Sequence, residues 1–242
     1  MKMNIDNSLK PSLITGAFIF FGLIGMAAVL GYSALEFKGY ERVVTVKGLS
    51  EKEVPADVAV WVIRFSEASD DLSEIYASID RTQSKIINYL VKKGFSQNEI
   101  SIATPSVTDK LAQQYGDASK AGLRYTAMLG LTVRSSNIDL VRATMKSISE
   151  LGKTGIVFGG MEYQTPPEFI YTKLNSIKPV MIEEATRSAR EVAAKFASDS
   201  QSKLGKIRTA SQGQFTVEDL DASTPHIKKV RVVSTVEFYL SD

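Results

Sequence analysis

An uncharged run of 24 residues near the N-terminus, Ser12–Leu35, limits what this chain can be more than any other feature. The run is mostly apolar and contains no Asp, Glu, Lys or Arg. A helix rises about 1.5 Å per residue, so roughly 20 residues span the ~30 Å hydrocarbon core of a bilayer. A helix also pairs its own backbone amides, as lipid requires. The run therefore predicts a transmembrane anchor that contacts membrane lipid.

A cleaved signal peptide is the alternative interpretation of this run. The apolar region of such a peptide is usually only ~7–15 residues long. The nearest approach to a small-x-small cleavage site is Gly31-Tyr32-Ser33, and it is a poor one. We therefore favour an uncleaved anchor over a removed signal.

The long segment after the anchor decides the expected orientation. Two basic residues lie before the run and two after it, so the Lys/Arg count is balanced (Lys2, Lys10, Lys38 and Arg42). A following domain of about 200 residues translocates largely regardless of charge. We expect residues 1–11 to be a cytoplasmic tail, residues 12–35 the anchor, and residues 40–242 one extracytoplasmic domain. This describes a single-pass protein of the inner (cytoplasmic) membrane with its bulk in the periplasm, and the lack of cysteine fits that compartment.

The charges of the expected domain nearly cancel. Of the 29 basic and 27 acidic residues, the tail holds two and one, so 27 and 26 remain. This balance gives no strong field for a nucleic acid, and no nucleic-acid partner is expected. The densest basic cluster, Lys228-Lys229-Val230-Arg231, lies in an alternating segment and is expected to be a solvated strand face.

The first part of the domain predicts two strands and a helix. Arg42–Lys47 and Asp57–Phe65 are rich in β-branched residues, and Gly48–Pro55 is expected to connect them as a hairpin. The next segment is expected to be a helix capped by Ser69 and closed by Gly94. Its apolar face repeats at helical spacing (Leu72, Ile75, Tyr76, Ile79, Ile86, Ile87, Leu90).

The middle of the chain alternates strand and helix patterns. We expect a strand over Glu99–Thr108 interrupted by Pro105, a polar loop over Lys110–Ala121, and a strand over Leu123–Arg134 with one buried face. A second helix follows, capped by Asn137 and ending near Gly152.

Three further elements complete the pattern. Gly155–Gln164 is expected to be a strand with a bulge at Gly159-Gly160. A long helical stretch should begin at Pro166-Pro167, break or kink at Pro179, and end near Leu204 at Gly205. It carries a ridge of small side chains (Ala185, Ala189, Ala193 and Ala197), with Met181, Val192 and Phe196 beside it.

Two strands close the chain, Lys206–Phe215 and Val230–Leu240. The expected order after the anchor is therefore β-β-α-β-β-α-β-α-β-β. Strands and helices in this order predict an α+β fold, a mainly antiparallel sheet with helices packed on one face.

Four short motifs lie in order along the chain and cover roughly Val43–Leu240. They are Val46-Lys47-Gly48 followed by Pro55-Ala56-Asp57, Gly94-Phe95 to Ile100 with Thr104, the aromatic-led strand at Tyr125, and the Ala-rich helix Glu184–Ala197 with Leu204-Gly205. Together they resemble the SIMPL domain (DUF541) family, which includes the bacterial periplasmic YggE-like proteins. The departures are Lys47, where the family often has a small residue, and Ser202, where glycine is common. The resemblance implies an envelope protein, associated with oxidative-stress tolerance, that tends to self-associate, and it supplies no reaction.

The side chains offer little catalytic chemistry. The chain has one histidine, His226, and no cysteine, which removes thiolate catalysis, zinc–thiolate sites and multi-histidine metal sites. His226 lies in a polar linker and is expected to be a solvated loop histidine. We therefore expect no catalytic residue, no metal site and no cofactor.

Carboxylates are the remaining candidates for acid–base work. Asp70-Asp71 suits the positive end of a helix dipole, and Glu183-Glu184 suits the solvated side of the long helix. The acidic loop with Glu218, Asp219 and Asp221 could hold a divalent cation loosely, but it lacks the spacing of a calcium loop.

The sequence thus predicts a membrane-anchored, non-enzymatic protein with a structural or stress-tolerance role in the envelope, which forms a homo-oligomer. An open sheet leaves an edge for a neighbouring subunit, and Trp61, Met128 and Tyr239 are expected on the wet faces of the strands. Two alternatives stay open. One is an extracytoplasmic module that binds a small ligand or envelope component, and the other is an envelope hydrolase that uses carboxylates such as Asp57 or Asp70.

Overall fold

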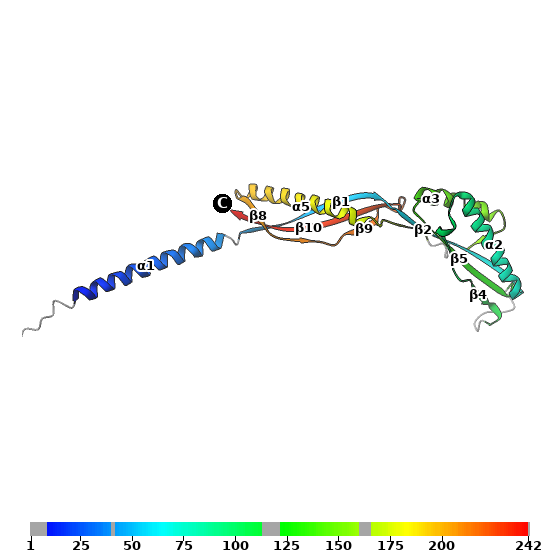
Figure 1. Ribbon diagram of the computed structural model, residues 1–242, viewed down its shortest axis with the longest axis horizontal. Coiled ribbons are helices and arrows are strands. Elements are labelled where there is room, and N and C mark those ends of the chain that lie inside the picture. The colour runs from blue at the N-terminus through cyan, green and yellow to red at the C-terminus, as the bar shows by residue number, and fades with distance from the viewer. Residues whose placement is uncertain (1–8, 40–41, 113–121, 160–165, 242) are drawn as a thin grey trace, which may run out of the picture. The chain divides into compact units, whose positions relative to one another are not determined.

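A computed structural model describes residues 9–39, 42–112, 122–159 and 166–241 (Figure 1). The chain divides into two compact units, which are treated separately below. Unit 1 comprises residues 1–50, 179–215 and 232–242, and unit 2 comprises residues 51–178 and 216–231. The architecture is α+β with mainly antiparallel sheets, as the sequence predicts.

The N-terminal helix α1 spans Leu9–Gly39 and is longer at both ends than the expected anchor. Within it, Ile14–Ser33 is long and apolar enough to cross a membrane. The side chains of residues 14–33 are exposed, so no described part of the protein covers this apolar surface. Such a helix is compatible with a single-pass anchor and also with a signal sequence.

Sheet A is built from the first and last strands of the domain. Its order is β1 (Val43–Pro55), β10 (Ile227–Ser241) and β8 (Lys203–Gln212), and β9 (Thr216–Asp219) also pairs with β10. The pairs of β10 with β8 and β9 are antiparallel. The expected hairpin over 48–55 is wrong, because β1 continues to Pro55 and leaves only two residues before β2. Alternation of buried and exposed residues continues past Gly48, which favours a strand over a turn.

Helix α5 (Leu174–Asp199) packs on sheet A in unit 1 through the expected alanine ridge. Every alanine of the ridge is buried (Ala185, Ala189, Ala193 and Ala197). Gly48 lies directly beneath it: a Cβ placed there would be 1.8 Å from the Ala185 carbonyl oxygen and 2.5 Å from the Ala189 amide nitrogen. Strand and helix are therefore in backbone contact, which small residues on both sides permit.

The bulky residues beside the ridge behave differently from one another. Met181 is fully buried, whereas Val192 and Phe196 remain 39% and 54% exposed, so of the three side chains beside the ridge only Met181 belongs to the buried face. Glu184 was expected on the solvated side, but its carboxylate accepts a hydrogen bond of 2.8 Å from the hydroxyl of Ser50, which is buried. The face of α5 toward β1 is thus wider than the ridge alone.

The core cluster of unit 1 is small and contains one aromatic side chain. Phe238 of β10 is fully buried and packs with Val46, Val236, Ala189 and Ala193. The guanidinium of Arg190 lies over the Phe238 ring, 5.3 Å from its centroid. The other buried members of this cluster are valine and alanine residues, so Phe238 is its largest side chain.

Helix α5 ends in a Schellman arrangement at an unexpected residue. Gln201 takes a left-handed conformation with φ of 56°, the Ser202 amide donates to the Ala197 carbonyl (2.8 Å), and the Gln201 amide donates to the Ser198 carbonyl (3.0 Å). Gly205 is not the terminator: it lies inside β8, where its missing side chain allows close approach to Tyr239. The helix also continues through Pro179.

Replacing Gln201 by glycine is expected to raise the free energy of unfolding by about 1 kcal/mol, because only glycine adopts the left-handed region without a steric cost. Urea denaturation followed by circular dichroism measures the change. The same substitution at Gln212, which lies at the end of β8 with no positive φ, should not stabilise the protein. Equal effects at both positions would contradict the prediction.

Sheet B belongs to unit 2 and is centred on a long antiparallel pair. β2 (Val58–Ser69) and β5 (Tyr125–Ser135) pair without a register shift from Ala59↔Ser135 to Ser69↔Tyr125. Short strands complete the sheet on both sides: β3 (Ile100–Ile102) and β4 (Ser106–Asp109) pair with β5, and β6 (Val157–Phe158) and β7 (Glu168–Ile170) pair with β2.

Helices cover one face of sheet B (Figure 1). They are α2 (Leu72–Lys93) and α3 (Ile138–Ser147), with the short α4 (Ser149–Gly152) after α3. Two 3-10 turns, Gln97–Glu99 and Lys110–Ala112, complete the described elements. The core contains apolar residues from both layers (among them Ile63, Phe65, Ile75, Ile86, Leu90, Leu131, Val133 and Val141). This core is much larger than that of unit 1.

The ends of α2 show which residues define the helix. Asp71 is the N-cap, and its carboxylate accepts the Glu74 amide at 2.9 Å. Ser69, the expected cap, instead accepts from the Asp71 amide. Gly94 closes the helix with φ of 111°, as expected. The cap therefore lies two residues later than the sequence suggested, since either Ser or Asp fits the pattern.

Three other predictions for unit 2 need correction. Trp61 is buried in the core beneath the helices and does not lie on the wet face. The pair Pro166-Pro167 precedes β7 and not a helix, because each proline also disfavours the α region for the residue before it. Of the expected strand over 155–164, the described residues 155–159 contain β6, and residues 160–164, with Gly160 of the expected bulge, lie outside the described part of the chain. Residues 113–121 of the expected loop also lie outside it.

Candidate functional site

The two-residue corner between β1 and β2 joins three segments of unit 2. The Ala56 amide donates to the carbonyl of His226, and the Asp57 amide donates to the carbonyl of Ile170, both at 2.9 Å. The Asp57 carboxylate accepts the amide and the hydroxyl of Thr172, at 2.8 and 2.9 Å. Asp57, a candidate hydrolase carboxylate, thus fixes the segment after β7.

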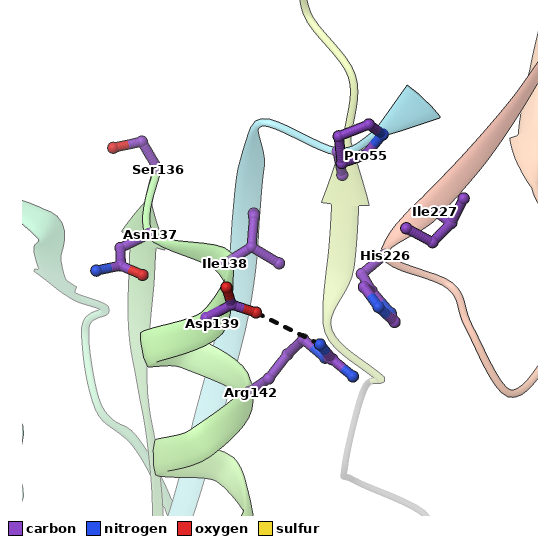
Figure 2. Close-up of a pocket in the computed structure, with 9 residues that line it drawn as sticks. Pro55, Ser136, Asn137, Ile138, Asp139, Arg142, His226 and Ile227 are labelled. Atoms are coloured by element: carbon purple, nitrogen blue, oxygen red, sulfur yellow. Dashed lines mark hydrogen bonds and ion pairs between the residues drawn. The ribbon is translucent and has the colours of Figure 1, made fainter. Parts of the chain in front are cut away.

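A pocket of about 600 Å³ opens beside this corner (Figure 2). Its volume lies within the range of ~300–1,000 Å³ usual for small-molecule sites. The lining comes from the corner, the start of α3 and the start of β10 (Pro55, Ala56, Ser136, Asn137, Ile138, Asp139, Arg142, His226 and Ile227). The wall thus combines polar side chains from α3 and from the start of β10 with proline and isoleucine side chains.

The start of α3 is fixed by its own cap. The Asn137 side chain accepts the Leu140 amide at 3.0 Å, and the Asn137 amide donates to the Ser135 hydroxyl at 3.1 Å. This cap, which the sequence predicts, sets the position of Asp139 and Arg142 on the first turns of the helix.

Arg142 supplies the positive charge of the pocket. Its Nη1 lies 3.5 Å from the carboxylate of Asp139, whose side chain is 93% exposed. An exposed pair at this distance is weak. In the part of the chain that the structure describes, this is the one hydrogen bond of the guanidinium, which can donate five.

His226 lines the pocket and is half-buried, so its expected place in a solvated loop is wrong. Its ring lies edge-on to Phe169, with centroids 6.0 Å apart. Burial, and then the charge of Arg142, lower the pKa of the imidazole, while the carboxylates of Asp139 and Asp221 oppose this shift. The imidazole is therefore neutral at pH 7.

The acidic loop is occupied by the protein itself. The Asp221 carboxylate accepts the amides and hydroxyls of Ser223 and Thr224, which lowers the pKa of Asp221 from its usual value to about 2. Asp219 belongs to β9 and is ion-paired with Lys228, whose side chain is only 10% exposed. No group of acidic residues or histidine within the described residues could hold a metal ion.

Similar contacts show that the prediction for the basic cluster of β10 is wrong. Lys228 is buried beside Asp219, while Lys229 and Arg231 each lie 3.3 Å from the carboxylate of Glu51 on β1. Two carboxylates therefore offset part of the positive charge of the cluster, and because Lys228 is buried the cluster is not a fully solvated strand face. Asp70, the other candidate hydrolase carboxylate, accepts the Arg124 amide at 2.8 Å.

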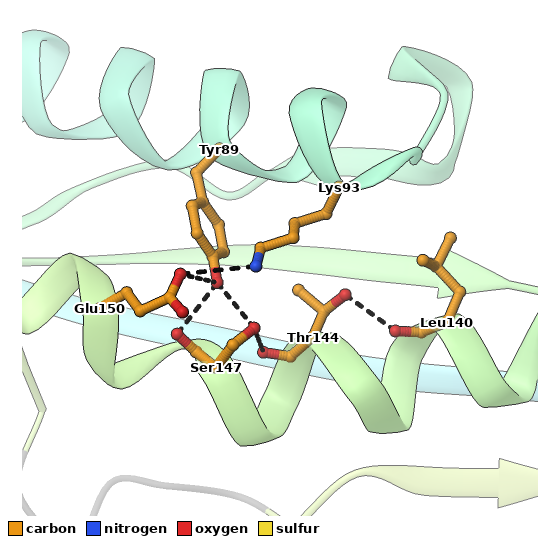
Figure 3. A network of polar contacts seen from close by, with 6 residues as sticks. All are labelled: Tyr89, Lys93, Leu140, Thr144, Ser147 and Glu150. Carbon is orange, nitrogen blue, oxygen red and sulfur yellow. Dashed lines mark hydrogen bonds and ion pairs between the residues drawn. The ribbon is translucent and has the colours of Figure 1, made fainter.

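A second polar cluster joins α2 to α3 and α4 (Figure 3). The Tyr89 hydroxyl lies 2.9 Å from both the carbonyl and the hydroxyl oxygen of Ser147, and 3.4 Å from the Glu150 carboxylate. Lys93 lies over the Tyr89 ring and 3.4 Å from Glu150. These contacts between the side chains of the cluster hold α2 against α3 and α4.

Comparison with known proteins identifies the family. A family model described as SIMPL, a protein of unknown function (DUF541), matches residues 44–238. The chain belongs to the SIMPL family. The matched region contains the whole pocket and the Gly48 contact with α5. No curated protein matches the chain.

The sequence predicted the helix start and the motif that border this pocket, but not the charged side chain that lines it. Asn137 was expected to cap a helix, and Pro55–Asp57 was noted as a motif, yet Arg142 received no role. His226 and Arg142 lie far apart in the chain and are brought to one pocket only by the fold. The i,i+3 spacing of Asp139 and Arg142 is a local signal that places these two side chains on one helix face, but no local pattern links either of them to His226.

Proposed function

We propose that this SIMPL protein is a single-pass, periplasmic and non-enzymatic envelope protein that self-assembles and has a structural or stress-tolerance role. The long apolar helix α1 supports the anchored state, since none of its described side chains from 14 to 33 is buried. Tethering to a membrane raises the local concentration of the domains, so weak contacts between copies persist.

The edge of sheet A is the observation that carries self-assembly. β8 ends the order β1-β10-β8, so among the described residues one side of β8 has no strand beside it. Its ten residues are mostly exposed, from Lys206 to Gln212 without a break. A long open edge presents unpaired amide and carbonyl groups, and pairing with another copy satisfies them. Tyr239 and Met128, expected at interfaces, are both half-buried.

Light scattering on the detergent-extracted full chain tests the assembly at micromolar concentration. We expect a mass above that of the monomer, and a monomer would overturn the proposal. Mass spectrometry of the same sample determines the mature N-terminus, and a chain that begins near Ala34 would remove the anchor.

Cysteine cross-linking tests the edge itself, because the chain has no cysteine of its own. Single cysteines at Lys206, Thr209 and Ser211 place thiols along β8, and pairing of two β8 edges should bring at least one position close enough for a disulfide. Ser149→Cys in α4, also exposed, is the matched control. If the protein forms oligomers and only the Ser149→Cys variant cross-links, the interface does not lie at β8.

A further inference from the structure

We propose that the pocket beside the Pro55–Asp57 corner binds a small organic carboxylate, with its charged group held by Arg142 and His226. The hydrocarbon part of the ligand then lies against Pro55, Ile138 and Ile227. All these residues line one pocket of unit 2 (Figure 2). This site is separate from the β8 edge and does not depend on assembly.

Arg142 is suited to a carboxylate because of its geometry and its partner. A guanidinium presents parallel N–H donors that match the two oxygens of a carboxylate. Figure 2 shows the Arg142 side chain extending from α3 toward the side of the pocket that carries His226. Asp139 engages only Nη1, at 3.5 Å, so most donors remain available within the described surroundings.

His226 adds a second donor from a different element. Its backbone is fixed by the hydrogen bond from Ala56, and its ring by the contact with Phe169. Within the described residues, neither ring nitrogen of His226 has a hydrogen-bond partner. A neutral imidazole donates one N–H, and an anion beside it favours the second proton. The ring can therefore strengthen its contact with an incoming carboxylate.

The size and the walls of the pocket indicate an organic acid. About 600 Å³ is much more space than a bare inorganic anion needs, and four side chains of the wall are apolar (Pro55, Ala56, Ile138 and Ile227). A cation is disfavoured, because Asp139 is the one acidic residue of the lining and it already faces Arg142. The ligand class is thus an amphipathic carboxylate with a compact hydrocarbon group.

The single histidine makes the test direct. In a nuclear magnetic resonance spectrum of the detergent-extracted full chain, the imidazole protons of His226 are the only histidine signals. We expect benzoate or hexanoate to shift these signals saturably, with a midpoint at or below about 1 mM. Hexanamide, which lacks the charge, and inorganic phosphate, which lacks the hydrocarbon, should shift them much less. An equal response to phosphate would show a general anion site and overturn the assigned class.

The pH dependence provides an independent readout. The charged groups around the ring are Arg142 on α3, Asp139 on α3 and Asp221 in the turn before β10. A bound carboxylate adds negative charge and should raise the pKa of His226, so the midpoint of its titration moves upward. By linkage the ligand binds more tightly below that midpoint than above it. An unchanged midpoint in saturating hexanoate would contradict the proposal.

Two variants change the affinity in opposite directions. Arg142→Gln should weaken hexanoate binding about tenfold or more, because it removes the charge-assisted hydrogen bonds. Asp139→Asn should strengthen binding, because it removes the competing carboxylate from Arg142. Arg187→Gln is the matched control: Arg187 forms a similar exposed pair with Glu183 on α5, and its loss should leave binding unchanged.

Using two variants keeps the test decisive. If circular dichroism shows that Arg142→Gln does not fold, the expected increase in hexanoate affinity of Asp139→Asn still tests the site. Binding that is unaffected by Asp139→Asn, or lost equally in Arg187→Gln, would overturn the role of Arg142.

Discussion

Gly48→Ala is expected to lower the free energy of unfolding by ~3 kcal/mol or more, at the upper end of what overpacking costs. The added Cβ would lie 1.8 Å from the Ala185 carbonyl oxygen, and no rotamer change can relieve a contact with backbone. Helix α5 would have to move away from β1, which opens the alanine ridge along its length. Urea denaturation of the full chain in detergent measures the loss.

Gly130→Ala is the matched control for this effect. Gly130 also lies inside a strand, but a Cβ there would meet its nearest neighbour at 3.8 Å, an ordinary contact. The control should change stability by less than about 1 kcal/mol, and the lower entropy of the unfolded chain favours a small gain. Similar losses in both variants would show that strand glycine, and not the contact with α5, determines the result.

Phe238→Ala should cost about 3–5 kcal/mol, the usual range for deleting a buried phenylalanine side chain. Phe238 is fully buried and is the largest side chain of the small core cluster between sheet A and α5. Its neighbours include Ala189 and Ala193, which are too short to close the space. The cavity therefore remains, and the contact with Arg190 is lost as well.

Phe196→Ala separates this loss from a general effect of removing an aromatic ring. Phe196 lies on α5, in the same unit, but is 54% exposed. Its replacement should change stability by about 0.5 kcal/mol at most, and alanine is a good helix former. Hydrogen exchange of the α5 amides provides a local readout: only the Phe238 variant should lose protection. Equal loss in both variants would contradict the small-core interpretation.

The sequence predicted those elements whose signals are local. Strict alternation in β5, the periodic apolar face of α2, Gly94 at its end, and the alanine ridge all appear where they were expected. The errors occur where a residue type fits two local structures. Gly48 suited a turn but lies in a strand, Gly205 suited a helix end but lies in a strand, and a left-handed glutamine ends α5 instead. Packing against a distant element decides each case, and no local pattern reports it.

Burial of charged residues was the other property that local patterns missed. Lys228 belongs to a basic run that alternates like a wet strand, yet its partner Asp219 on β9 allows it to be buried. The same holds for the candidate pocket, whose polar wall needs β10, the corner and α3 together. Trp61 was placed on the wrong face because both faces of β2 carry apolar residues, so alternation alone does not say which side the helices cover.

The pairing of β1 with β10 affects how the domain folds during synthesis. β10 occupies the middle of sheet A, and the carbonyl of Arg42 before β1 accepts the Leu240 amide at 2.8 Å. Contacts between such distant residues carry a high loop-closure cost and slow folding. Until β10 has been synthesised and has left the ribosome, β1 lacks the strand that it pairs with in sheet A. Sheet A therefore forms only after β10 is available, and a chain truncated before β10 would leave the edge of β1 open to neighbouring chains.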